Sequence, residues 1–133
     1  MSVIRFGVSL EQHLMDDLDK YVEENQFPNR SQAIRNLIER NIVEKKWKCN
    51  NEVAGAIVLL YDHHKRDISK KANTVQHDYY KNILSSQHVH LNHDMCLETI
   101  AVKGKAKQLT EIADKLIALK GVQHGKLVMT KTD

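Results

Sequence analysis

The stretch QHVHLNHDMCLE, residues 87–98, concentrates three histidines and one cysteine in twelve residues. His88 and His90 are two residues apart, and Cys96 follows the second histidine by six. If the histidines lie on a strand, their side chains share one face, so both imidazoles can approach one ion at about 2 Å. After a turn, an antiparallel strand would bring the Cys96 sulfur alongside that face. The spacing therefore predicts a metal site that needs a fourth ligand for tetrahedral or square-planar geometry.

The residue types narrow the choice of ion without selecting one. Imidazole suits Zn, Cu, Fe and Ni, and thiolate suits the softer ions of that series. A lone surface histidine is usually solvated and a lone buried cysteine usually packs in a core. It is the combination on adjoining strands that favours a metal site. Val89, between the two histidines, is expected to point the other way, into the core.

The segments around these residues predict a unit that would hold them in place. Their apolar patterns alternate between strand and helix, and the resulting order is βαββαβ. That order predicts a ferredoxin-like domain within an α+β fold. The expected strands are 53–62, 85–94, 95–104 and 122–130, and the expected helices are 65–80 and 107–120.

The N-terminal part has a different pattern. IRFGVSL, residues 4–10, alternates apolar and polar side chains as a short strand does. Helices are expected from about residue 10 to 25, with Ser9 as a capping residue, and again after Asn29. One strand and two helices cannot close a core, and a lone strand leaves both edges unpaired. A dimeric ribbon-helix-helix arrangement solves both problems, although the strand could instead pair with the C-terminal sheet.

The segment KKWKCNNE, residues 45–52, is polar and predicts a linker between two domains, 1–48 and 49–133. With two cysteines in 133 residues, reduced thiols and a cytoplasmic location are expected. The sequence shows neither a long apolar run nor a secretory leader, so no membrane partner is expected. The net charge is +3, and residues 1–48 are balanced in charge. DNA binding must therefore depend on where the charges lie.

Over nearly its full length the chain resembles the nickel-responsive transcriptional regulators (NikR), which join a ribbon-helix-helix domain to a ferredoxin-like domain of the ACT type. The stretches that carry the resemblance are RFGVSL, NRSQAIRNLI, YDHHKRD, VQHDYY, HVHLNHDMCLE and GVQHGKL. The resemblance implies one Ni²⁺ per subunit, held by His88, His90 and Cys96 with His77 of a neighbouring subunit. It also implies a homotetramer built as a dimer of dimers. Three nitrogens and a thiolate can form a square-planar d⁸ site.

The same resemblance implies that double-stranded operator DNA is the partner. Paired N-terminal strands would enter the major groove, and the second helix would hold a phosphate at its N-terminus. Gly7 has no side chain, so one reading position is missing. The implied DNA-contacting residues are Arg5, Gly7, Ser9, Asn29, Arg30, Ser31, Lys65 and Arg66.

In one respect the chain departs from some members of the family. They carry acidic residues where this chain has Gln32 and Asn36, so a second cation site between the domains is expected to be weaker or absent. His63 and His64 are candidates for additional low-affinity metal binding. His93 is expected to pack near the main site and influence it.

The resemblance implies a regulator and not an enzyme: a repressor of nickel uptake genes that binds its operator when nickel is bound. A regulator responding to another transition metal is the first alternative. A second is a zinc enzyme built on His88, His90 and Cys96 with Glu98 as a base, although an enzyme has no use for a ribbon-helix-helix unit. A third is a repressor whose ACT domain binds an amino acid, which leaves the four aligned ligands unexplained.

Overall fold

The computed structural model describes residues 2–65 and 67–133, and the chain divides into two compact units. The first extends to Asn41 and the second is Ile42–Asp133. Helix α2, Arg30–Lys48, contributes to both units. The predicted domain boundary between residues 48 and 49 coincides with the end of this helix and stays a prediction. Among the described residues, no helix is long and apolar enough to cross a membrane.

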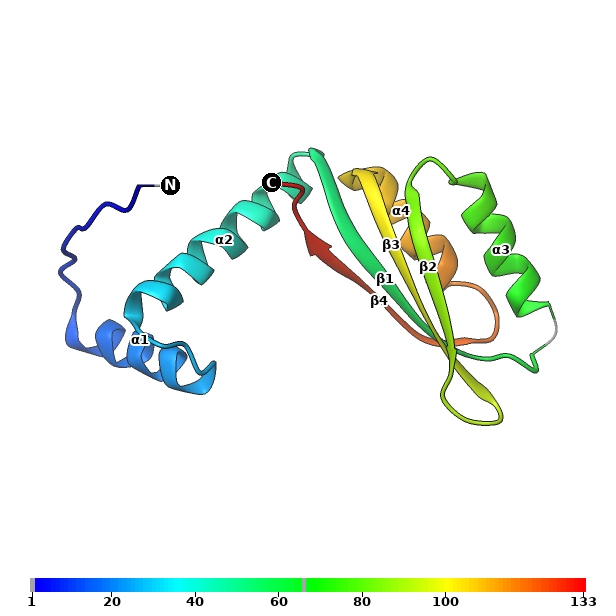
Figure 1. The fold of residues 1–133 in the computed structure, drawn as a ribbon, viewed down its shortest axis with the longest axis horizontal. Coiled ribbons are helices and arrows are strands. Elements are labelled where there is room, and N and C mark those ends of the chain that lie inside the picture. The colour runs from blue at the N-terminus through cyan, green and yellow to red at the C-terminus, as the bar shows by residue number, and fades with distance from the viewer. Residues whose placement is uncertain (1, 66) are drawn as a thin grey trace. The chain divides into compact units, whose positions relative to one another are not determined.

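The second unit has the predicted βαββαβ order and is built on one antiparallel sheet (Figure 1). The strand order across the sheet is β2-β3-β1-β4, so the two strands nearest the middle are the first and third. This arrangement is the ferredoxin-like fold expected from the sequence. Its elements are β1 Glu52–Asp62, α3 Ile68–Asp78, β2 Ile83–His90, β3 Met95–Lys105, α4 Ala106–Ile117 and β4 Val122–Thr130.

The core of this unit lies between the sheet and the helices. Alternate residues of β1, including Ile57, Leu59 and Tyr61, are fully buried on one face, as are Ile100 and Val102 of β3. Helix α4 contributes an apolar stripe to the same core, and buries Leu109, Ile112, Ala113 and Leu116. Side chains on the opposite face of the sheet are only partly buried. The sheet therefore has one face covered by helices and one open face.

Two boundaries in the C-terminal unit differ from the predictions. The segment predicted as a linker continues α2 to Lys48, and Trp47 is buried with its Nε1 donating to the Thr130 carbonyl at 2.8 Å. Polar neighbours concealed this anchor, since an indole is readily buried when its N–H finds a partner. Helix α3 begins at Ile68 and not at residue 65, because Asp67 has a left-handed backbone with φ of 65°.

In the first unit, α1 spans Gln12–Glu24 and α2 follows after a short turn. The N-cap of α1 is Glu11 and not Ser9, so the expected capping box is absent. The expected cap of the second helix is present: Asn29 Oδ1 accepts a hydrogen bond from the Gln32 backbone N–H at 2.9 Å.

Side chains join the two helices of this unit. Arg30 makes a two-bond ion pair with Asp19, with distances of 2.7 and 2.9 Å. The Tyr21 hydroxyl donates to Asn36 Oδ1 at 2.5 Å. One of the amides that stand where some relatives have acids is therefore already engaged.

The ribbon strand predicted at residues 4–10 is not observed. Residues 2–11 form no regular secondary structure, and residues 2–10 are all exposed. A strand is defined by hydrogen bonds to a neighbour, and the strands that the structure describes within this chain all belong to the C-terminal sheet. The alternative, that this segment pairs with that sheet, is not observed either. The ribbon-helix-helix assignment is thus unconfirmed in the single chain.

Candidate metal centre

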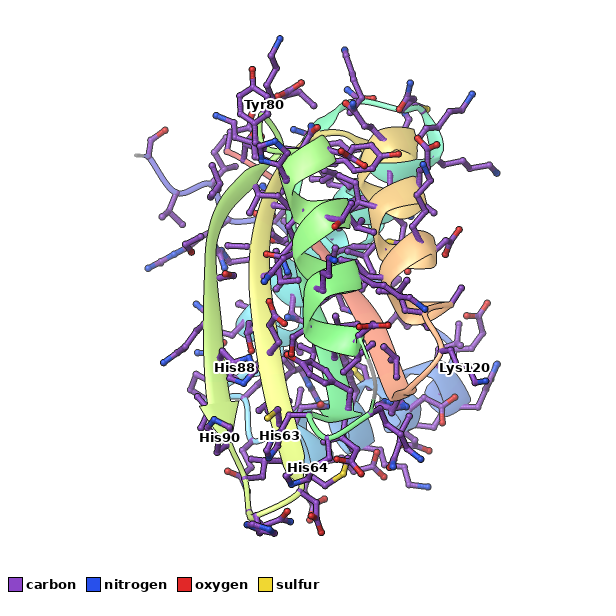
Figure 2. All side chains as sticks on the ribbon, turned by 90° about the vertical axis from the view of Figure 1, so that its right-hand side faces the viewer. His63, His64, Tyr80, His88, His90 and Lys120 are labelled. Atoms are coloured by element: carbon purple, nitrogen blue, oxygen red, sulfur yellow. The ribbon has the colours of Figure 1, made fainter. Side chains whose placement is uncertain are left out.

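The β2–β3 hairpin sets the positions of the predicted ligands. In its register His90 pairs with Cys96, and His88 pairs with Glu98. Cys96 and Glu98 are buried on the helix-covered face, so both histidines belong to that face too. Val89 lies on the open face with 43% of its surface exposed, so its predicted place in the core is wrong. Figure 2 shows His88 and His90 at one end of the sheet, beside His63 and His64.

His90 and Cys96 form the closest pair of potential ligands in the predicted site. The Cys96 Sγ and the His90 Nδ1 are 3.4 Å apart. Donors at ordinary metal–sulfur and metal–nitrogen distances are separated by about 3.1 Å at a right angle and about 3.6 Å at a tetrahedral angle. The observed distance lies between these values. The pair therefore fits one transition-metal ion without rearrangement of the hairpin.

His63 joins this pair within the single chain. One ligand atom each from His63, His90 and Cys96 lie within 4.8 Å of one another, and the two imidazole centroids are 5.0 Å apart. His63 follows β1, the strand next to β3, so the sheet brings it close. Its side chain is half-buried. The sequence identified His63 only as a low-affinity candidate, because the order of the strands was needed to place it here.

His88 is held by a hydrogen-bonded network and lies outside that group of three. Its Nδ1 is 3.0 Å from the Tyr61 hydroxyl, which donates to Glu98 Oε1 at 3.0 Å. Because the hydroxyl proton goes to Glu98, the His88 Nδ1–H donates to the Tyr61 oxygen. This leaves the lone pair of His88 on Nε2, the nitrogen that remains for a metal. Gln76 Nε2 donates to the other Glu98 oxygen at 2.8 Å.

Burial controls the ionisation of the groups below the histidines. Burial raises the pKa of the Cys96 thiol, and the nearby Asp62 and Glu98 carboxylates raise it further. Burial and the neighbouring Glu98 likewise raise the pKa of the Tyr61 hydroxyl. Both groups are therefore protonated at neutral pH in the absence of metal. A metal ion that binds Cys96 must displace the thiol proton.

His77 is the predicted ligand that the single chain does not bring to the others. It lies in the last turn of α3 and is exposed, whereas its neighbour Gln76 reaches Glu98. The groups of three potential ligands formed by the described residues include neither His77 nor His88. Assignment of His77 to the site of a neighbouring subunit stays a prediction.

The predicted DNA contacts fall in several places. Arg5, Gly7 and Ser9 lie in the exposed N-terminal segment, and no atom comes within 4 Å of a Cβ built on Gly7. Lys65 lies in the exposed loop after β1, next to Gly121. Arg66 lies outside the described residues.

The remaining predicted contacts are at the start of α2. Asn29, Arg30 and Ser31 are all exposed there. Asn29 caps the helix through its side chain, and the Arg30 guanidinium is paired with Asp19. A phosphate at this helix end would meet backbone N–H groups first, since both side chains already have partners.

Comparison with known proteins identifies related chains. The family model described as the NikR C terminal nickel binding domain matches residues 54–130. A protein of Thermococcus kodakarensis described as "Putative nickel-responsive regulator" is 50% identical over 133 residues, which cover 99% of this chain and 96% of that protein. Proteins of Geobacter sulfurreducens and Pyrococcus furiosus with the same description are 48% and 47% identical. The former match covers 97% of this chain and 94% of that protein, and the latter 99% and 96%.

A solved structure also resembles the C-terminal unit. An uncharacterized protein of Thermotoga maritima matches with a TM-score of 0.55 and 16% sequence identity, over 61% of this chain and all of that chain. At this identity the likeness shows the fold alone.

Proposed function

The chain belongs to the nickel-responsive regulator family, and on this premise we propose that it is a Ni(II)-dependent, sequence-specific DNA-binding repressor of nickel uptake genes. The relatives are described as regulators, which fits a non-enzyme. The observation that carries the proposal is the 3.4 Å approach of the Cys96 sulfur to the His90 imidazole. This pair lies on the same strand face as His88, whose Nε2 lone pair is available.

In the proposed site, His88, His90 and Cys96 of one subunit and His77 of a neighbouring subunit hold one Ni²⁺ per subunit. The exposure of His77 supports this arrangement, because the side chain is free to reach another chain. A donor set of three imidazoles and one thiolate suits a square-planar ion. Within one chain, His63 is the competing donor beside His90 and Cys96.

The proposed DNA-binding unit is a ribbon-helix-helix dimer formed by two copies of the N-terminal unit. Val3, Ile4 and Phe6 are 88%, 85% and 73% exposed, which is costly for a chain that remains alone in water. These side chains line an apolar groove of ≈ 780 Å³ together with residues of both helices. Pairing of residues 4–10 with the same segment of a second copy would satisfy the strand edges and cover the groove.

Once paired, this segment would present Arg5, Gly7 and Ser9 to the major groove of operator DNA. Arginine can make two hydrogen bonds to guanine, and serine can donate or accept one. Further contacts to the DNA backbone are proposed for a second set of residues. These are Asn29, Arg30 and Ser31 at the start of α2, and Lys65 and Arg66.

The proposed homotetramer is a dimer of dimers in the cytoplasm, joined through the C-terminal units. The open face of their sheet supports this assembly, because its apolar side chains are left partly or fully exposed. Val89 and Val128 are 43% and 51% exposed, and Val58, Leu60 and Leu97 are partly buried. A second sheet packed on this face would bury them.

The test combines nickel titration with selection of DNA. The untagged protein should bind one Ni²⁺ per chain with a thiolate-to-metal absorption band and elute as a tetramer from gel filtration. A DNA sequence enriched from a random pool with nickel should lose affinity when the metal is removed by a chelator. If Zn²⁺ or Co²⁺ supports the same DNA affinity at lower free concentration, the regulator responds to another metal. If no sequence is enriched, the DNA-binding proposal is wrong.

The identity of the fourth ligand needs a separate comparison. His77→Ala should weaken nickel binding more than His63→Ala if a neighbouring subunit completes the site. The reverse order would assign the site to His63, His90 and Cys96 of a single chain.

A further inference from the structure

A second group of potential metal ligands lies at the turn between β2 and β3. One ligand atom each from His64, His93 and Asp94 lie within 4.8 Å of one another. The His64 Nε2 is 3.4 Å from Asp94 Oδ1, and the His64 and His93 ring centroids are 5.2 Å apart. We propose that these three side chains bind a divalent transition-metal ion at a site separate from that of Cys96.

The two loops that carry these residues are fastened to each other. The His63 backbone N–H donates to the Asp94 carbonyl at 3.0 Å, which joins the loop after β1 to the hairpin turn. Within the first loop, Asp62 Oδ1 accepts from the His64 N–H at 2.9 Å. Within the turn, Asn92 Oδ1 accepts from the Asp94 N–H at 2.9 Å. The backbone thus fixes the ligands before an ion arrives, which lowers the entropy lost on binding.

The donor set defines the class of ion. Two imidazoles and one carboxylate suit borderline divalent ions such as Ni²⁺, Zn²⁺ and Co²⁺. His64, His93 and Asp94 are all exposed, so water can occupy the remaining coordination positions. The site lacks a thiolate. Its affinity should therefore be lower than that of the Cys96 site, and its occupancy should add nothing to thiolate-to-metal absorption.

The second site adjoins the first but shares no side chain with it. His63 belongs to the group with Cys96, and His64 belongs to the exposed group. Their ring centroids are 3.9 Å apart, so the two ions would be close neighbours. Without metal, the His63 and His64 Nε2 atoms lie 2.6 and 3.1 Å from the His93 carbonyl oxygen. An ion at the second site would replace the contact of His64 and leave that of His63 in place.

The experiment is equilibrium dialysis of the untagged full chain against excess Ni²⁺, with absorption recorded on the same samples. The double variant His93→Ala with Asp94→Asn should bind one ion per chain fewer than wild type, while its thiolate band is unchanged. His13→Ala, at an exposed histidine of α1, is the matched control and should not change the stoichiometry by a full ion.

Two results would overturn the second site. One is a double variant that binds as many ions as wild type, and the other is a thiolate band that falls along with the lost ion. Failure of the proposed nickel-dependent function is a different result. Wild type would then lack the thiolate band while the double variant still bound one ion fewer.

Discussion

Cys96 is fully buried, whereas His88 and His90 beside it are exposed, and this contrast gives the ligands different tasks. The exposed imidazoles can meet an ion that arrives from water. The buried thiol loses its proton only when a metal replaces it, since burial raises its pKa. The thiolate would be the sole anionic donor of the proposed four, so we expect it to supply much of the affinity for a thiophilic ion.

Cys96→Ala should abolish tight Ni²⁺ binding and leave the fold intact. Loss of a direct ligand should cost more than the 10–100-fold (roughly) that follows loss of a group supporting a ligand. Nickel affinity is measured by competition with a chelator, and the fold by circular dichroism. Cys49→Ala removes the exposed cysteine and should leave the affinity unchanged. Unaltered affinity in the Cys96 variant would contradict the site assignment.

Tyr61→Phe should weaken nickel binding without removing any ligand. The variant loses the bond that orients His88 and one of the donors to the buried Glu98 carboxylate. Groups that support metal ligands in this way contribute on the order of 10–100-fold to affinity. Tyr79→Phe is a suitable control, because Tyr79 bonds to Lys115 and not to the site. Equal affinity of the Tyr61 variant and wild type would show that the network has no role in metal binding.

At the scale of secondary structure elements, two segments carry the proposed functions, and they differ in how far one chain completes them. The β2–β3 hairpin is paired along its length and brings its ligands together by register alone. The segment 2–11 has no regular structure, because its proposed strand partner is another copy. We infer that metal binding begins within a subunit, and that DNA reading depends on dimer formation.

Arg5→Ala should remove specific DNA binding and leave nickel binding and assembly unchanged. A lost two-bond contact to a base costs about 1–3 kcal/mol, and a dimer carries two copies. The measurement is the affinity for the nickel-selected DNA sequence relative to a scrambled duplex. Lys20→Ala, at an exposed position of α1, is the charge-matched control. If the Arg5 variant keeps the same preference between the duplexes, residues 4–10 are not the reading element.

Local sequence patterns predicted the elements of the C-terminal unit well. The last strand was predicted at 122–130 and is found there, and His88 and His90 share a face with Cys96 as expected. The same patterns missed Tyr61 and His63, because which strand lies beside β3 depends on long-range pairing. They also missed Trp47, whose burial needs the distant Thr130 carbonyl. Contacts fixed by alternation were predictable, and contacts fixed by topology were not.

At the scale of the whole molecule, helix α3 is the element through which nickel could influence DNA binding. Near its C-terminal end, Gln76 bonds to Glu98, and the exposed His77 is free to reach a neighbouring subunit. Its first residue, Ile68, follows soon after Lys65, a proposed contact to the DNA backbone. A metal that fixes one end of the helix would lower the entropy lost when the other end meets DNA.

His77→Ala should therefore impair nickel-dependent DNA binding by more than its loss of metal affinity explains. The variant would hold nickel through three groups of one chain, and the ion would no longer tie α3 to the neighbouring subunit. By linkage, DNA should also tighten nickel in wild type by the factor that nickel tightens DNA, and this factor should be smaller in the variant. The measurement is titration of the selected DNA with nickel saturating in both proteins. Asp78→Asn, at the next exposed position of α3, is the matched control. Equal DNA affinity of wild type and the His77 variant at full nickel occupancy would make His77 a ligand without a role in coupling.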